Sequence, residues 1–311
     1  MKRILLYLLI IISLSAFDSK ACDICGCKLG GLSYGILPQY DSHFIGLRYS
    51  NASFKAEINY NSPYDQDVYS NDTYNRVDLI GRYVVTSKIY LNVIFPYMHN
   101  VMRGNEQNIS VSGIGDPMML IYYNPINTGY EMEKRWKHSL LIGGGLKLPL
   151  GNYQAVDNGE IINRNFQLGS GSLDYVVSLN YTLRYNLWGV NIESSYKMNT
   201  KNKENYQFGN QINYSSYLFY QIETTLASIL PYGGFYYEWS DLHKDGIIIQ
   251  TNTGGKVLFA SIGSQIIRSN WSINVQFQIP VNQSYNVDQY SSISAGERTT
   301  IGLMYNISSK R

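Results

Sequence analysis

The sequence predicts an all-β chain: a transmembrane, antiparallel up-and-down β-barrel of about twelve strands. Three observations predict it: long segments of alternating apolar and polar residues, a composition rich in tyrosine and glycine, and connections that alternate between long and short. In segment 173–184 the odd positions carry Leu, Tyr or Val and the even positions are mostly polar. Successive side chains of a strand point to opposite faces, so this segment has one apolar and one polar face. Tilted strands of roughly 9–11 residues are long enough to cross a bilayer.

The composition agrees with a barrel whose strands alternate in polarity. The 311 residues include 29 Tyr, 27 Gly and 8 Pro, and 15% of them are charged. Tyrosine is enriched where a membrane meets water, because its ring is apolar and its hydroxyl is polar. A soluble, secreted all-β protein is the alternative, but its strands would usually be shorter. The formal net charge is +2 without a basic run, which gives no reason to expect nucleic acid as a partner.

The N-terminus has the order of a secretory signal peptide. Two basic residues precede an apolar stretch that runs to Ala16, and segment 19–21 (Ser-Lys-Ala) then provides small residues for cleavage. Residues 1–21 are therefore expected to direct Sec-type export, with a cut after Ala16 as an alternative. With the barrel, this predicts the outer membrane of a Gram-negative bacterium as the location and outer-membrane lipid as a partner.

The expected strands fill most of the chain after residue 42, so we assign 43–311 to the barrel. Odd-numbered connections are long and even-numbered ones are mostly short, as in outer-membrane barrels; connection 124–135 is the exception. Strand 254–267 alternates poorly, because Lys256 and Gln265 are out of phase, which indicates a bulge or a shifted register. The expected strands are 43–54, 75–86, 88–103, 114–123, 136–149, 172–184, 187–199, 207–221, 229–241, 254–267, 270–280 and 299–308.

Charged residues fall on the polar face of several expected strands and are assigned to the lumen, because a Lys or Arg facing lipid costs roughly 2–4 kcal/mol at the bilayer midplane. They could line a channel and set its selectivity. Alternatively, charges of both signs could bridge a narrow lumen and fill it, since a barrel of this size lies between filled and open ones. The expected lumen-lining residues are Arg76, Asp78, Arg82, Asp116, Lys147, Asp174, Arg184, Glu193 and Lys197.

All three cysteines lie together in the expected periplasmic segment 22–42, which could also plug the barrel. Cys22, Cys25 and Cys27 form a Cys-x-x-Cys-x-Cys run. Clustered thiolates suit Cu or Zn, although Zn usually takes four ligands. A Cys22–Cys25 disulfide, which leaves Cys27 for a periplasmic partner protein, is the alternative in an oxidising compartment. We favour metal, because an odd triplet is a poor covalent crosslink.

Three short motifs occur in order along the expected strands. They resemble the "MetA-pathway of phenol degradation" family of Gram-negative outer-membrane transporters, distant relatives of FadL-type channels for hydrophobic compounds. The resemblance implies a barrel that passes small molecules, and the cysteine run resembles a subgroup of that family. The motifs are the segments Ser112–Pro117, Gly145–Gly151 and Leu168–Asp174.

The sequence therefore predicts a porin-like channel or transporter for a small-molecule or metal solute. A metal-handling barrel and a structural or receptor barrel are the alternatives. We assign neither an enzymatic activity nor a catalytic residue to this chain.

Overall fold

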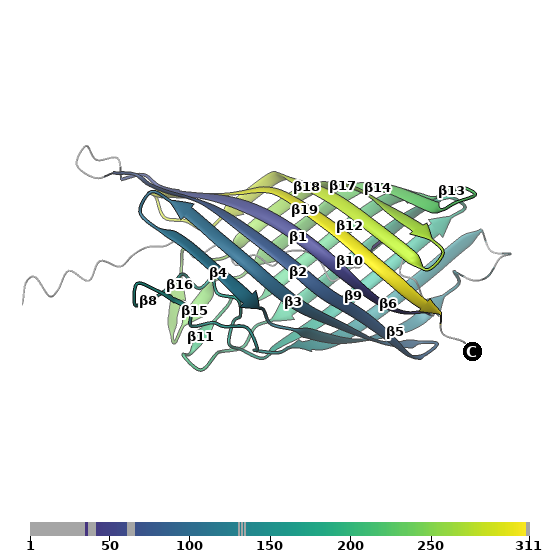
Figure 1. Ribbon diagram of the computed structural model, residues 1–311, viewed down its shortest axis with the longest axis horizontal. Coiled ribbons are helices and arrows are strands. Elements are labelled where there is room, and N and C mark those ends of the chain that lie inside the picture. The colour runs from purple at the N-terminus through teal and green to yellow at the C-terminus, as the bar shows by residue number, and fades with distance from the viewer. Residues whose placement is uncertain are drawn as a thin grey trace, which may run out of the picture.

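The computed structural model describes residues 35–36, 42–60, 66–129, 131, 133 and 135–308. Within them an antiparallel sheet closes into a twelve-stranded barrel, because β1 pairs with β19 and β12 pairs with β14 (Figure 1). The fourth strand is split: β4 and β5 both pair with β3. The wall strands are β1 (Ser42–Ile58), β2 (Val68–Thr86), β3 (Ile89–Gly104), β4 (Asn108–Ile114) with β5 (Met118–Asn127), β6 (Trp136–Lys147), β9 (Asp174–Tyr185), β10 (Trp188–Met198), β12 (Gln211–Tyr220), β14 (Ser228–Ser240), β17 (Gly255–Arg268), β18 (Trp271–Tyr285) and β19 (Ser291–Ser308).

The predicted fold class is confirmed, but several strands are longer than predicted. β2 begins at Val68 rather than at 75, and β19 begins at Ser291 rather than at 299. These extensions carry polar residues on both faces, so the apolar alternation that predicts membrane-spanning residues does not mark them. Most of the expected loop 104–113 is β4, which continues the wall beside β3.

The connections differ in size at the two ends of the barrel. At the short-turn end, β2 and β3 are joined by Ser87 and Lys88, and β17 and β18 by Ser269 and Asn270. At the opposite, long-loop end, the connections carry small sheets of their own (Figure 1). Short strands in these connections are β7 (Val156–Asp157), β8 (Glu160–Ile161), β11 (Tyr206–Gln207), β15 (His243–Asp245) and β16 (Ile248–Gln250), while β13 (Ile222–Glu223) lies at the short-turn end.

The outer wall is apolar and carries aromatic pairs at the short-turn end. Outward side chains of neighbouring strands, such as Leu47, Leu79 and Leu303, are about half exposed. Rings of Trp and Tyr prefer the boundary between lipid and water. The paired rings, with their centroid separations, are Trp136–Tyr185 at 4.6 Å, Trp188–Tyr220 at 4.8 Å and Trp271–Tyr305 at 4.9 Å.

The poor alternation in 254–267 has a structural explanation. The ladder between β17 and β18 shifts at Leu258 and Phe259, because Val281 is an extra residue on β18. β17 itself alternates without a break: Lys256 is exposed and Gln265 is fully buried. The irregular pattern arises because apolar Val257 and Phe259 face inward whereas charged Lys256 faces outward.

No helix among the described residues is both long and apolar enough to cross a membrane.

Candidate functional site in the barrel lumen

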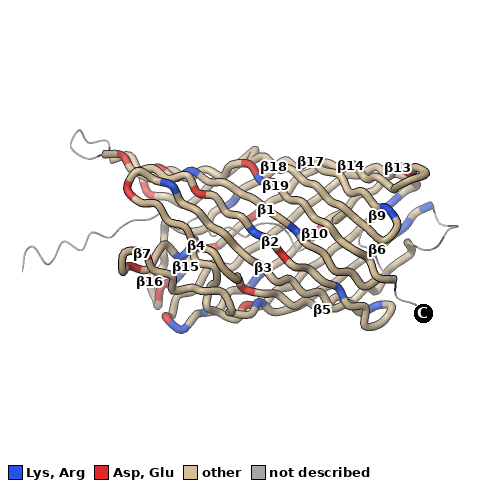
Figure 2. Tube along the Cα trace, in the orientation of Figure 1, with Lys and Arg blue, Asp and Glu red and all other residues tan. Residues whose placement is uncertain are grey.

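The structure places the nine charged residues expected in the lumen on the inward phase of the wall or at its loop junctions. Charged residues lie along the middle of the barrel as well as at its ends (Figure 2). Seven of the nine are buried, and the Asp116 side chain is 7% exposed. Arg184, near the short-turn end, is half-buried and donates a hydrogen bond to Gln221. The buried seven are Arg76, Asp78, Arg82, Lys147, Asp174, Glu193 and Lys197.

A first charge cluster joins β1 and β2 across the lumen side of the wall. The Asp78 carboxylate accepts from Arg48 Nη2 at 2.8 Å and Nε at 2.9 Å, and from Arg76 Nε at 2.5 Å. Asp78 is fully buried and Arg48 is 5% exposed. Arg48 is not among the residues expected in the lumen, although its place on the same face of β1 as Gly46 and Ser50 indicates that it points inward.

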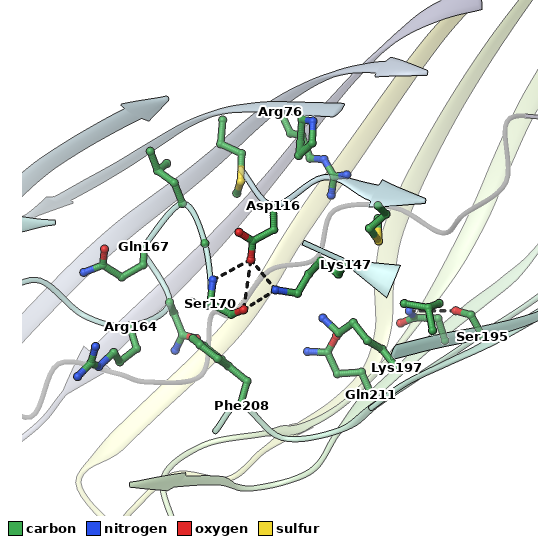
Figure 3. A pocket seen from close by; sticks show the side chains of 18 residues that line it. Arg76, Asp116, Lys147, Arg164, Gln167, Ser170, Ser195, Lys197, Phe208 and Gln211 are labelled. Atoms are coloured by element: carbon green, nitrogen blue, oxygen red, sulfur yellow. Dashed lines mark hydrogen bonds and ion pairs between the residues drawn. The ribbon is translucent and has the colours of Figure 1, made fainter. Parts of the chain in front are cut away.

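A second cluster brings the three sequence motifs together around one lysine. Lys147 Nζ lies 2.5 Å from Asp116 Oδ2 (Figure 3). The same atom lies 2.9 Å from Asp174 Oδ2. It also donates to Ser170 Oγ and, at 3.1 Å, to the carbonyl of Ser172. The motifs therefore meet in one ion-pair network, which we call the Lys147 network.

The Lys147 network holds the connection between β6 and β9 against the wall. Asp116 accepts backbone N–H bonds from Gly151 and Ser170, both at 2.9 Å, and so fixes the connection at both ends. Asp116 can reach them because β4 and β5 are interrupted at 115–117, where the chain leaves the ladder. This anchoring role agrees with the interpretation that lumen charges bridge the barrel.

The middle of that connection folds into the barrel, which the sequence analysis did not predict. Phe166 is 1% exposed and packs on Tyr74 with 5.1 Å between ring centroids. Ile162 and Phe166 join an apolar cluster with Phe54 of β1 and Phe259 of β17. The interior is therefore partly filled with apolar side chains, and the in-folded segment 162–170 narrows it near the long-loop end.

A third ion pair lies in the same region. Arg298 on β19 donates to the Glu238 carboxylate on β14 at 2.8 and 2.9 Å. Its guanidinium also lies 4.1 Å from the centre of the Phe259 ring. This ion pair joins two strands that are separated by β17 and β18, and the separation of 60 residues along the chain hides it from sequence analysis.

A cavity remains beside the in-folded segment. It contains about 980 Å³ of empty space, part of it open to solvent (Figure 3). Its wall comes from β2, β3, β5, β6, β9, β10 and β12 together with the connection between β6 and β9. Arg164 lies at its rim and pairs with Glu204 of the next connection at 2.5 Å. The hydrogen bond from Gln154 and the Arg164 charge lower the pKa of Glu204. The stabilisation that Glu204 gains from these partners is therefore fully present above the pKa of its unfolded state. It is lost as the pH falls through the lower pKa of the folded state.

At the short-turn side of the lumen, two residues of the N-terminal segment lie inside the wall. The Ile36 N–H donates to Gln265 Oε1 at 2.8 Å, and the Ile36 side chain, 3% exposed, packs with Tyr217 and Phe219. A Cβ on Gly35 would lie 2.8 Å from Gln265 Oε1, so a larger residue at this position would clash with the Gln265 side chain.

The metal prediction is untested by this geometry. Cys22, Cys25 and Cys27 lie outside the described residues. Within the described part of the chain, no group of three or more His, Cys, Asp or Glu side chains is arranged to hold a metal ion.

A closed antiparallel barrel with an apolar outer wall, aromatic pairs at one end and buried charges inside has the architecture of an outer-membrane β-barrel. Solved structures agree. An outer membrane channel from Pseudomonas putida F1 is similar over 90% of this chain and 100% of its own, with a TM-score of 0.64 and 13% identity. The β domain of the Bordetella autotransporter BrkA is similar over 86% of this chain and 100% of its own, with a TM-score of 0.50 and 9% identity.

A Pseudomonas aeruginosa FadL homologue is similar over 86% of this chain and 89% of its own, at 10% identity, but its TM-score of 0.40 is too low to carry an argument. The sequence matches no protein-family model and no curated protein. The likeness to outer-membrane channels is thus one of fold, and the cysteine-motif subgroup stays a prediction.

Proposed function

We propose that the protein is a Gram-negative outer-membrane channel that passes small molecules through its lumen. The observation that carries this proposal is the cavity inside a closed barrel, with lysine and arginine side chains on its wall. A purely structural barrel of this size, by contrast, could have its interior filled with side chains. The fold shared with the Pseudomonas putida channel supports the same reading.

The direct test is solute flux into liposomes that contain the purified, folded chain. We expect small sugars and organic acids to enter faster than into protein-free liposomes, with larger solutes excluded. A folded barrel that admits none of them would refute the channel and favour a receptor or structural role.

We propose further that segment 22–42 narrows the lumen through Gly35 and Ile36. The substitution Gly35→Val places atoms where Gln265 now lies, so it should displace the segment. We expect single-channel conductance to rise by about twofold, since the narrowest part of a pore limits conduction. In a Gln265→Ala background the clash is removed and only the backbone strain of valine at a φ of +153° remains, so the same substitution should raise the conductance by less. Equal conductance in all of these variants would contradict the plug.

A metal-handling role is the second candidate, and the spacing of three thiols within residues 22–27 is the observation that favours it. We expect protein purified anaerobically in detergent to contain about one Cu or Zn per chain, and the Cys22/Cys25/Cys27→Ser variant to contain none. Elemental analysis measures both. A metal-free wild type with a Cys22–Cys25 disulfide would reject this role and leave the channel unaffected.

A further inference from the structure

The side chain of Asn165 is buried in the cavity wall without an internal partner. It is 5% exposed and lines the cavity, yet neither Nδ2 nor Oδ1 has a hydrogen-bond partner among the described residues. Its position is fixed by its own backbone, because its N–H donates to Asn163 Oδ1 at 2.8 Å. A buried polar group that stays unsatisfied costs about 1–3 kcal/mol, so such groups usually have a water or ligand partner.

The charges on the cavity wall are mainly positive. Arg76, Lys147, Arg164 and Lys197 line it, and Asp116 is the one acid among the described lining residues. The acids that pair with Arg76 and Lys147 from behind, Asp78 and Asp174, are fully buried and are not among the described lining residues. Cationic side chains therefore outnumber carboxylates among the described lining residues, which favours an anion inside the cavity.

The cavity wall also carries apolar side chains that can contact the apolar part of a ligand. Met98, Met118, Val176, Leu168 and Phe208 line the cavity. Two thioethers and an aromatic ring form an adaptable apolar surface, because methionine side chains adjust to the shape of their neighbours. Ligand sites commonly combine such a surface with a few polar groups that fix orientation.

We propose that this cavity binds a small organic carboxylate with an apolar body. The Asn165 amide donates from Nδ2 to the carboxylate, the surrounding cations offset its charge, and the apolar body lies against the methionines. The inference rests on the proposed function, since it names the class of solute that the channel selects. Asn165 acts in it as a specificity-determining residue.

The test is binding of benzoate to the full chain in detergent, measured by isothermal titration calorimetry, with benzyl alcohol as the uncharged analogue. We expect benzoate to bind at least about tenfold more tightly than benzyl alcohol. The substitution Asn165→Leu should weaken benzoate binding by about tenfold, the effect of losing a hydrogen bond to a charged group. The control Asn158→Gly, at an exposed turn of the same connection with a left-handed backbone, should bind as the wild type does.

Asn165→Asp provides a second variant if the leucine variant does not fold, and we expect its added negative charge to weaken benzoate binding further. Benzyl alcohol that binds as tightly as benzoate, or benzoate binding unchanged in a folded Asn165 variant, would overturn the proposal. Flux in liposomes without benzoate binding would reject this site alone. Benzoate binding without flux of any solute would reject the channel alone.

Discussion

Replacing Lys147 with methionine is expected to cost the barrel about 3–5 kcal/mol of unfolding free energy, the typical effect of removing one partner of a buried ion pair. The substitution keeps the apolar stem but leaves Asp116 and Asp174 as neighbouring buried carboxylates without the ammonium between them. Urea unfolding in lipid vesicles, followed by tryptophan fluorescence, measures the loss. Because the network also anchors the connection between β6 and β9, the surviving folded fraction should conduct more than the wild type.

The matched control is Lys203→Met, which removes the same charge from an exposed position in the next connection. Its unfolding free energy should stay within about 0.5 kcal/mol of the wild type. A Lys147→Met variant as stable as this control would show that the network contributes nothing to anchoring, and the account of the in-folded segment would then be wrong.

Asp78→Asn is expected to change both stability and ion selectivity. The neutral amide leaves Arg48 and Arg76 close together beside the lumen, which should cost about 3–5 kcal/mol. The same change adds a positive charge to the pore wall, so the ratio of anion to cation permeability should rise by about threefold. Reversal potentials in a salt gradient measure this ratio. Asp245→Asn, exposed in the hairpin of β15 and β16, should leave both quantities unchanged.

Selectivity that stays constant in Asp78→Asn while stability falls would assign this cluster a structural role alone. That is the alternative which the sequence leaves open for charges of both signs in a narrow lumen.

The sequence predicts the barrel well because alternation with a period of two is a local property. The wall strands that carry Asp78, Asp174 and Glu193 alternate cleanly, so the inward phase of these residues follows from the pattern. The three motifs also mark residues that meet in space, although nothing in their spacing indicates that Lys147 joins them.

The filled part of the lumen could not be predicted in the same way. Phe166 reaches Tyr74 from a connection without periodicity, and this contact depends on where the Lys147 network fixes the loop. Tyr90 and Ile94 are apolar and inward, in a strand that is apolar on both faces, so alternation cannot separate lumen from lipid there. Arg298 and Glu238 pair between β19 and β14, which are separated by two strands, so the contact depends on the curvature of the sheet.

The measurement that tests the central claim most directly is single-channel current from the purified chain in a planar lipid bilayer. The channel account predicts discrete conductance steps that become larger in Gly35→Val and in Lys147→Met. A barrel shown to be folded by heat-dependent gel mobility that gives no steps, in the wild type and in both variants, would contradict it.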